Sequence, residues 1–452
     1  MKKKLFLMLP LLIMAVIALP AQDATRKSVN VTVYNGDLGV IRDIRQFDIK
    51  SGTSEIILED VAERIDPTSV HIKLDGSVLE QNFKYDLVSM YKILSKYLDK
   101  KIALTSKEGT YYEGVLLSIN ANQIVLKKDD GGLLMLPKID DYQISVGKLP
   151  EGLITKPALV WTVAAKAAKK QDVEVTYQTS GLSWNAEYVA VLNKDDSKMD
   201  LNSWVSITNS SGATYPDAKP KVVAGDVNRV QDFMEKDGIM FAKADMAEGA
   251  RQFEEKAFFE YHIYDLQRQS TIANNENKQI SLFEASDVSI KKKFVLTTGQ
   301  WNAQKQKVQV MVEFENKAKN NLGMPMPKGK VRLYKSDGES VEFIGEDRID
   351  HTAKDETVKL KVGEAFDVVA DIKTLSEKKI TDKVYENSYS VKIRNHKTEA
   401  IEVEVFRNLG SYWQISETNI NYEKKDANNV VFKVPVKADG EFELLYTVKY
   451  RY

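Results

Sequence analysis

The sequence contains four histidines, the residues best suited to metal binding and to acid–base chemistry near neutral pH. They are His71, His262, His351 and His396, and no two have the spacing of metal ligands on one helix or strand. His262 lies in an aromatic segment that is expected to be a strand, so a structural hydrogen bond is its simpler role. His351 is the better candidate for a metal or acid–base site. Three carboxylates accompany it, at Asp347, Asp350 and Asp355, but residues 349–356 also have the composition of a polar turn.

Carboxylates at short spacing point to a second kind of chemistry. Glu313 and Glu315 alternate onto one face of an expected strand, and a pair of carboxylates can cleave a glycosidic bond. Charged outer faces of structural strands show the same pattern. The segment Tyr215-Pro216-Asp217 adds a carboxylate near a tryptophan-rich region, but proline followed by aspartate is typical of a turn.

Motifs with a defined catalytic mechanism are missing from the sequence. There is no Gly-x-Ser-x-Gly nucleophile segment and no Gly-x-x-x-x-Gly-Lys-Ser/Thr phosphate loop. The absence of cysteine excludes thiolate catalysis and cysteine-based metal sites. We therefore assign no catalytic, cofactor-binding or metal-ligating residue and no cofactor, and we expect a protein that is not an enzyme. A hydrolase that acts on envelope glycan or peptide is the alternative.

The five tryptophans are the largest apolar side chains of the sequence. They stand at Trp161, Trp184, Trp204, Trp301 and Trp413, spread over segments with strand patterns. Each ring can bury roughly 200 Å², so we expect them to anchor cores. A carbohydrate-binding platform would instead need exposed, coplanar rings.

Residues 1–21 have the features of a secretory signal peptide. Lysines at positions 2–4 precede an apolar run from Leu5 to Ala18, and Pro20 and Ala21 follow as a processing site. The run is short for a membrane span of roughly 20 residues. We expect cleavage after Ala21, export to the periplasm or cell surface, and no transmembrane span after cleavage. Without cysteine the protein cannot be a lipoprotein, and it cannot depend on disulfides for stability.

The charge of the chain is balanced, with 64 Lys+Arg against 65 Asp+Glu. A balanced chain has no general attraction for nucleic acid or for anionic membranes. Hydrophobic residues make up 43% of the sequence, enough to build several cores. The oligomeric state is open at this point.

Alternating apolar and polar residues predict a mainly β fold built from β-sandwich domains. Short strands are expected at 29–34, 40–49, 56–58 and 70–74, so residues 27–85 are interpreted as the strands of an N-terminal sandwich. A second β-rich core with the tryptophan motifs is expected at 155–230. A flexible linker without strand pattern follows at 231–257, and a C-terminal β-sandwich region at 258–452.

Residues 86–149 are predicted to form one short helix and a small SH3/Sm-like barrel. Asp86 is the expected helix cap, and five short strands follow at 102–105, 111–120, 123–128, 132–137 and 142–146. Gly114 lies where such a barrel bends sharply. Barrels of this type often bind RNA, but residues 92–149 hold nine Lys against seven Asp+Glu, without a clustered basic face. We therefore expect a structural or protein-binding module and no nucleic acid partner.

Short blocks along the mature chain resemble a known bacterial family. They lie at 31–35, 64–70, 183–188, 209–212, 223–227, 261–264, 333–334, 345–347, 362–367 and 393–397. In this order they are similar to the family called domain of unknown function 4139, which includes the mucoidy-inhibitor-A-like proteins. The resemblance implies an all-β protein of the cell envelope and implies no catalytic residues. Many members have a long coiled coil where this chain has the predicted barrel.

These observations together predict an exported protein of the cell envelope with a non-catalytic role in binding or assembly. The expected partners are other envelope proteins or surface polymers. A self-assembling structural subunit is a third hypothesis, and it requires exposed edge strands.

Overall fold

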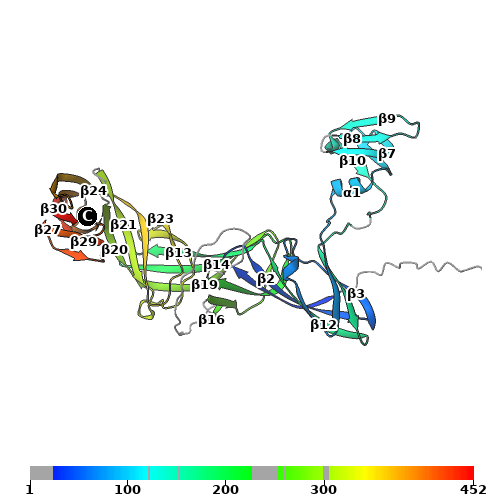
Figure 1. Cartoon of the computed structure of the whole chain (residues 1–452), viewed down its shortest axis with the longest axis horizontal. Coiled ribbons are helices and arrows are strands. Elements are labelled where there is room, and N and C mark those ends of the chain that lie inside the picture. Colours follow the sequence, from blue (N-terminus) through cyan, green and yellow to red (C-terminus); the bar gives the residue numbers. More distant parts are fainter. Residues whose placement is uncertain are drawn as a thin grey trace, which may run out of the picture. The chain divides into compact units, whose positions relative to one another are not determined.

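A computed structural model gives the structure of residues 24–120, 123–150, 153–225, 253–258, 261–298 and 305–451 (Figure 1). Strands make up most of this part of the chain, and its only α-helix is α1 (Met90–Lys96). The predicted mainly β, sandwich-like fold is therefore confirmed. Within the same residues no helix is long and apolar enough to cross a lipid bilayer. The predicted signal peptide lies outside the described residues.

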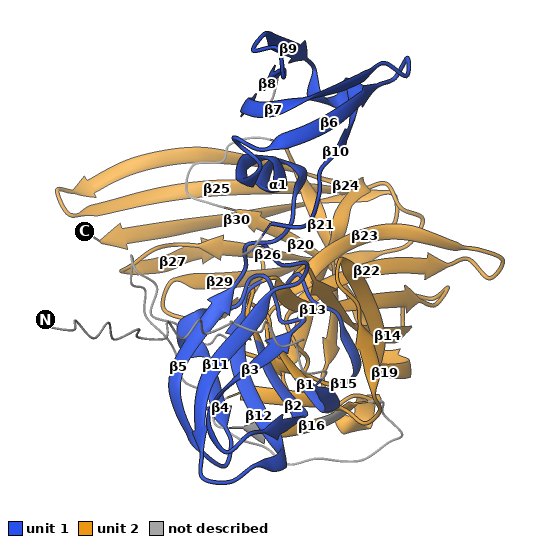
Figure 2. Cartoon of the chain, turned by 90° about the vertical axis from the view of Figure 1, so that its right-hand side faces the viewer, with its two compact units in different colours: residues 1–30, 40–180, 211–217 blue, residues 31–39, 181–210, 218–452 orange. Residues whose placement is uncertain are grey.

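The chain forms two compact units, each assembled from separate segments of the sequence (Figure 2). Unit 1 takes residues from 1–30, 40–180 and 211–217, and unit 2 takes residues from 31–39, 181–210 and 218–452. Three of the described strands contribute to both units, β1 (Thr25–Tyr34), β2 (Gly39–Ile49), which does so by Gly39 alone, and β15 (Tyr215–Ala224).

Unit 1 contains two groups of paired strands with the burial pattern of a sandwich. In the first group β12 (Lys169–Thr179) lies between β2 (Gly39–Ile49) and β4 (His71–Lys73). In the second, β11 (Ala158–Ala165) lies between β3 (Gly52–Glu59) and β5 (Ser77–Lys84). Alternate residues of β2 and β12 are buried, as expected for strands with one face toward a core. A short 3₁₀ turn, η1 (Pro67–Ser69), precedes β4.

The sequence analysis missed β5. Its residues are almost all exposed, with only Phe83 half-buried, so this strand lacks the alternation that marks a core-facing strand. Pairing with β11 makes it a strand, and pairing between distant segments cannot be read from local pattern.

The small barrel within unit 1 forms much as predicted. Its strands are β6 (Lys101–Ser106), β7 (Tyr111–Asn120), β8 (Gln123–Lys127), β9 (Leu133–Pro137) and β10 (Tyr142–Ser145), in the sheet order β10-β6-β7-β8-β9. A 3₁₀ turn, η2 (Ile139–Asp141), precedes β10. A Cβ at Gly114 would lie 2.8 Å from the carbonyl oxygen of Lys127, so a larger residue cannot occupy this close approach of β7 to β8. The core is apolar and contains Leu94, Tyr97, Ile102, Leu104, Leu116, Ile124, Leu126, Leu136 and Ile139.

The helix of this domain begins later than the sequence indicates. The predicted cap, Asp86, pairs instead through its carbonyl with the backbone N–H of Ile154, and Val88 donates to the carbonyl of the same residue. Because residues 86–88 are held extended, Ser89 caps the helix by accepting from the backbone N–H of Lys92.

Unit 2 contains a five-stranded sheet in the order β19-β14-β13-β22-β23. The strands are β13 (Leu182–Leu192), β14 (Lys198–Asn209), β19 (Glu276–Ser289), β22 (Gly329–Ser336) and β23 (Val341–Ile349). The pairing of β13 with β22 is parallel, and the other pairings are antiparallel. A Cβ at Gly329 would lie 2.1 Å from the carbonyl oxygen of Ala186, so this parallel approach requires glycine.

A smaller group of strands in unit 2 corrects the predicted linker. β17 (Tyr261–Leu266) lies between β15 and β16 (Phe253–Phe258), and β18 (Ser270–Ile272) follows. The predicted linker, 231–257, lies mostly outside the described residues, but β16 begins within it. The strand was missed because its Glu-Glu-Lys centre has no apolar alternation, and pairing with β17 defines it.

The C-terminal part of unit 2 is a nine-stranded sheet that curls on itself. Its order is β27-β30-β25-β24-β21-β20-β26-β29-β28. The bounds are β20 (Lys291–Thr298), β21 (Lys305–Glu315), β24 (Thr357–Thr381), β25 (Val384–Asn395), β26 (Ile401–Asn408), β27 (Trp413–Thr418), β28 (Tyr422–Lys424), β29 (Asn429–Val436) and β30 (Gly440–Arg451), with a 3₁₀ turn, η3 (Ala318–Asn320), after β21. The rings of Trp413 on β27 and Tyr422 on β28 lie 6.5 Å apart, so the two edges of the sheet come close together.

The inside of the curled sheet encloses a buried arginine among tyrosines. Arg407, on β26, is 1% exposed, and its guanidinium carbon lies 4.6 Å from the centre of the Tyr389 ring. Tyr389 in turn stacks on Tyr446 at 5.2 Å. The aromatic faces stabilise the buried cation by cation–π attraction.

Replacing Tyr446 with phenylalanine is expected to weaken the dependence of stability on alkaline pH. Burial raises the pKa of Tyr446 from 10.0 to about 12. Between these values the unfolded chain loses a proton that the folded protein keeps. The free energy of unfolding therefore has its full value below pH 10 and decreases as the pH rises from 10 through 12. The loss reaches at most about 2.7 kcal/mol.

Urea unfolding of both proteins at pH about 9 and about 11.5 measures this difference. The Tyr446 hydroxyl has no hydrogen-bond partner in the described part of the chain, so the variant should be as stable as the parent at neutral pH. Equal alkaline losses in the two proteins would contradict the assignment.

Candidate functional site

The structure gives the His351 region a structural role. The Nδ1 atom of His351 accepts from the backbone N–H of Lys328 at 3.2 Å. The Asp347 carboxylate accepts from the backbone N–H groups of Arg348 and Lys361, at 2.8 and 2.6 Å. Across the described ranges, no group of three His, Asp or Glu side chains could hold a metal ion. These side chains therefore accept hydrogen bonds from separate backbone groups, and Asp347 links β23 to β24.

His262 forms the local hydrogen bond that its place in a strand indicates. Its Nδ1 atom lies 2.6 Å from Oε1 of Glu255, and the two residues belong to the paired strands β17 and β16. This contact is the structural hydrogen bond expected of a histidine in a strand.

The carboxylates considered for glycoside hydrolysis are engaged by lysines. Glu313 lies 2.9 Å from the Nζ atom of Lys293, and Glu315 lies 3.0 Å from that of Lys319 and 3.2 Å from that of Lys317. Hydrogen bonds from Lys319 and Lys317 lower the pKa of Glu315. A general acid needs the opposite shift, toward neutral pH.

The Tyr215-Pro216-Asp217 segment is not the turn that was predicted. It begins β15, and Asp217 takes a left-handed backbone conformation with φ of 46° inside that strand. The Tyr215 side chain is buried and its hydroxyl lies 3.0 Å from that of Ser211. Tertiary packing of the tyrosine overrides the local turn preference.

The tryptophans divide between core and surface. Trp161 and Trp184 are fully buried, and Trp413 packs against the core of the nine-stranded sheet, as predicted. Trp204 is 36% exposed on β14, which corrects the expectation of a core role for it. Trp301 lies outside the described residues. The outward face of β14 is set by its register, which the sequence does not reveal.

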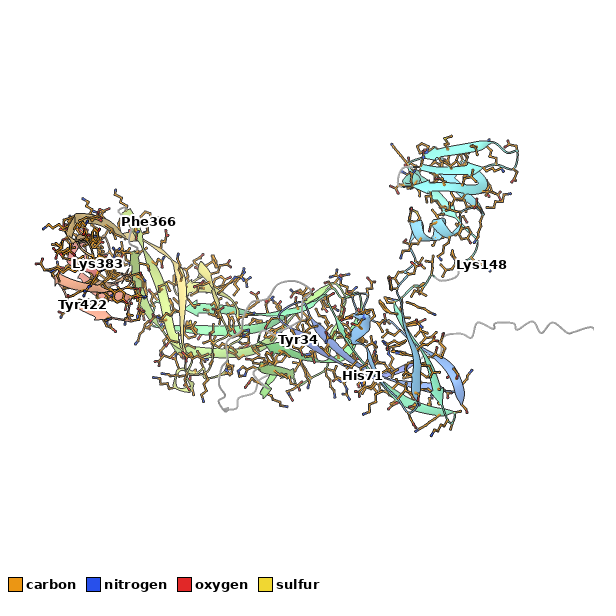
Figure 3. All side chains as sticks on the ribbon, viewed as in Figure 1. Tyr34, His71, Lys148, Phe366, Lys383 and Tyr422 are labelled. Carbon is orange, nitrogen blue, oxygen red and sulfur yellow. The ribbon has the colours of Figure 1, made fainter. Side chains whose placement is uncertain are left out.

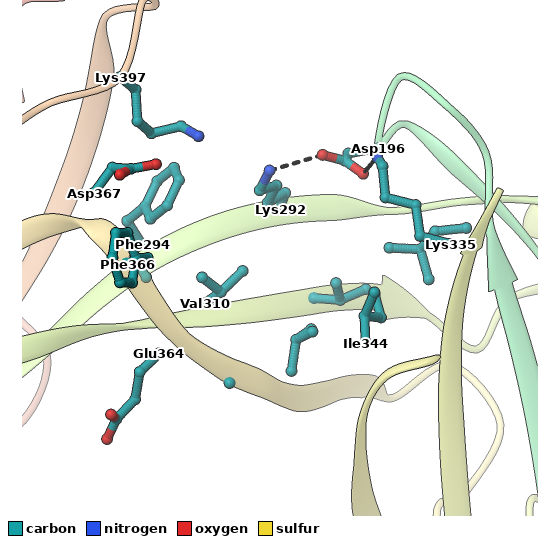
Figure 4. Close-up of a pocket in the computed structure, with 15 residues that line it drawn as sticks. Asp196, Lys292, Phe294, Val310, Lys335, Ile344, Glu364, Phe366, Asp367 and Lys397 are labelled. Carbon is teal, nitrogen blue, oxygen red and sulfur yellow. Dashed lines mark hydrogen bonds and ion pairs between the residues drawn. The ribbon is translucent and has the colours of Figure 1, made fainter. Parts of the chain in front are cut away.

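A small cavity in unit 2 brings together residues that no motif connects (Figure 4). Its volume is about 270 Å³. Apolar side chains from β13, β20, β21 and β23 line it, namely Leu192, Phe294, Val310, Val312 and Ile344. The other lining residues are Asp196, Lys292, Lys335, Val362, Gly363, Glu364, Ala365, Phe366, Asp367 and Lys397. We call this cavity the sheet pocket.

One border of the sheet pocket is an irregular bulge in β24. Lys307 pairs with Val369 and Gln309 pairs with Glu364, so Val308 alone faces residues 365–368 of β24. The bulge carries Phe366, whose side chain is 94% exposed (Figure 3). Bulges are known to redirect a side chain away from its sheet.

A salt-bridged aspartate forms the opposite border. Asp196 lies 2.7 Å from the Nζ atom of Lys292 and also pairs with Lys335, whose Nζ atom donates to the Lys194 carbonyl at 3.0 Å. Burial acts to raise the pKa of Asp196, but the hydrogen bonds from the two lysines outweigh it and lower the pKa. Asp196 is therefore a fixed anion that holds two lysines in place, unsuited to proton transfer near neutral pH.

The sequence analysis did not identify the sheet pocket. Residues 362–367 were noted only for their family resemblance, and their role as a bulge depends on pairing with β21. A phenylalanine followed by an aspartate in a strand carries no signal that its ring is exposed. The chemistry of the pocket is that of a small binding site, with apolar walls and charged borders.

Comparisons with known proteins add no assignment. No protein-family model matches the chain, and no curated protein matches it. The resemblance to the domain of unknown function 4139 family therefore stays a prediction.

Proposed function

We propose that the protein is exported to the cell envelope and acts there by binding another protein, without catalysis. Residues 1–21 would direct export to the periplasm or cell surface and then be removed. The ordered blocks that resemble the domain of unknown function 4139 family support the same placement. The binding site is the sheet pocket together with Phe366.

The exposure of Phe366 beside an apolar pocket carries this proposal. Burying a phenylalanine side chain contributes roughly 1.5–3 kcal/mol, so a partner that covers the 94% exposed ring of Phe366 would gain this free energy. Aromatic side chains next to pockets are frequent centres of binding energy in protein interfaces. The strand that presents Phe366 is held by pairing on both sides, with β21 and β25.

The walls of the pocket favour a peptide over a glycan as the bound segment. Phe294, Val310 and Ile344 present carbon surfaces, which suit the apolar side chain of an extended peptide. Lys292 and Lys335 are already paired with Asp196. A hydroxyl-rich sugar would leave its polar groups unsatisfied against the apolar walls.

The alternative, a hydrolase of envelope glycan or peptide, has weaker support. Its best carboxylates, Glu313 and Glu315, form ion pairs with lysines instead of facing a cavity. Of the carboxylates that line the sheet pocket, Asp196 is paired with two lysines and has a lowered pKa.

Replacing Phe366 with alanine is expected to weaken partner binding about tenfold to thirtyfold, because the ring would be the main apolar contact. The experiment places the photo-crosslinking residue p-benzoylphenylalanine at position 366 and irradiates envelope extracts. The matched control places it at Tyr412, an 81% exposed aromatic residue between β26 and β27. A discrete crosslinked protein is expected at 366 and not at 412, and its affinity is then measured with the Phe366→Ala variant.

A second variant tests the pocket itself. Gly363 lines the sheet pocket and a Cβ there has no atom within 4 Å, so Gly363→Leu should add an apolar side chain at the pocket without a clash at Cβ. Binding should fall as in the Phe366→Ala variant, with an unchanged thermal midpoint. Equal crosslinking at 366 and 412, or full affinity in both variants, would refute the proposed site.

A further inference from the structure

The strand β5 forms an open edge of the β3-β11-β5 sheet in unit 1 (Figure 2). In the described part of the chain it pairs with β11 alone. Val78 and Leu79 on this strand are 40% and 57% exposed. An edge strand of this kind presents alternate backbone N–H and C=O groups that are ready to pair with another strand.

The second half of β5 has the regular geometry that a new pairing needs. Its bulge is at Leu79, because Glu80 pairs with Thr162 and Val78 pairs with Val163. From Glu80 to Lys84 the pairing with β11 continues without a shift. The segment contains no proline, the residue that most directly blocks an edge. Residues 80–84 are therefore a straight, accessible edge.

The charges of this segment are complementary to themselves. In an antiparallel pair of two β5 strands centred on Asn82, Glu80 of each copy lies opposite Lys84 of the other. Centring the pair on Glu80 or on Lys84 would instead place like charges opposite each other, which is unfavourable. Neither Glu80 nor Lys84 forms an ion pair with any residue whose position is described. The pairing centred on Asn82 thus satisfies two charges that the single chain leaves in solvent.

Apolar side chains support the same register. Leu79 and Tyr85 flank the regular segment 80–84, so Leu79 of one copy would come near Tyr85 of the other, and these side chains are 57% and 68% exposed. The Tyr85 ring stacks on Phe83 at 5.4 Å, so it is held in place beside the strand. The contact would be repeated twice by the symmetry of the pair.

We propose that two copies of this protein associate through β5, in an antiparallel pairing centred on Asn82. The partner is a second copy of the same chain, and the interface is a two-fold continuation of the β3-β11-β5 sheet. This assembly does not depend on the sheet pocket or on the proposed function.

Exchanging the charges of Glu80 and Lys84 tests the proposed pairing. Sedimentation velocity and light scattering on the purified protein should show a dimer at high concentration that dissociates on dilution. Glu80→Lys alone and Lys84→Glu alone should each weaken the dimer about tenfold or more, because each creates two like-charge pairs. The double variant Glu80→Lys/Lys84→Glu restores opposite charges and should restore the dimer.

The control variant is Glu55→Lys on β3, at the other edge of the same sheet, where the residue is exposed. It makes the same change of charge and should leave the dimer unaffected. Since all these side chains are exposed, circular dichroism should show the same fold in every variant. A parent protein that is monomeric at its solubility limit, single variants that dimerise normally, or a double variant that stays monomeric would each overturn the proposal.

Discussion

Replacing Asp43 with alanine should lower the free energy of unfolding by about 3–5 kcal/mol. Asp43 lies on β2 in unit 1 and is 2% exposed. Its Oδ2 atom accepts from Nη2 of Arg26 at 3.0 Å and from Nη2 of Arg45 at 2.9 Å. The alanine variant would leave two guanidinium groups, both largely buried, without the carboxylate that neutralises them.

The burial of this group separates it from the many surface ion pairs of the protein. Arg42 and Glu174 form a pair at 2.5 Å, but their side chains are 49% and 29% exposed. Arg42→Ala should therefore cost no more than about 1 kcal/mol. Urea unfolding of both variants gives the comparison. Asp43→Asn keeps the shape of the side chain and removes its charge, so this variant separates the two contributions to stability. If Asp43→Ala and Arg42→Ala had equal effects, the arginine–aspartate cluster would not be a stabilising core element.

Replacing Trp184 with alanine should cost about 3–5 kcal/mol, because it removes a large buried side chain and leaves a cavity. Trp184 on β13 is fully buried, and its Nε1 donates to the Val223 carbonyl at 3.0 Å. Its ring meets the edge of the Tyr264 ring at 6.3 Å. The substitution therefore also removes a buried hydrogen bond.

Trp204, on the neighbouring strand β14, provides the matched control. It is 36% exposed, so Trp204→Ala should change stability by about 1 kcal/mol or less. Thermal unfolding followed by circular dichroism measures both variants. A cost at Trp204 as large as that at Trp184 would show that the surface tryptophan is covered by another part of the protein.

Local sequence pattern predicted the small barrel almost residue by residue. Its strands are short, follow one another directly and are separated by clear turn residues, so neighbours in sequence are neighbours in the sheet. The strand predicted at 111–120 coincides with β7. In such a meander the local pattern contains nearly all of the pairing information.

Features that depend on distant pairing could not be predicted. β5 pairs with β11 across more than seventy residues of sequence, and its own pattern is polar. The sheet pocket joins residues from Leu192 to Lys397. The exposure of Phe366 follows from the bulge opposite Val308, which is a property of two strands together. The candidate sites proposed from carboxylates and histidines rested on residues close together in the sequence, and in the structure those side chains bond to backbone groups and lysines instead of to one another.

The position of β30 has a consequence for the making of the protein. This strand, residues 440–451, lies between β27 and β25, and it supplies Leu444, Tyr446, Val448 and Tyr450 to the core of the curled sheet. During synthesis β20 to β29 are made before β30, so the position between β27 and β25 stays open until β30 is made. Until β30 is added, the core-facing side chains of β25 remain exposed to water, so this sheet can be completed only after residues 440–451 have been made. A chain that terminates before residue 440 would lack β30 and keep unpaired strand edges at β25 and β27. Chaperones and proteases would recognise the incomplete protein by these exposed edges.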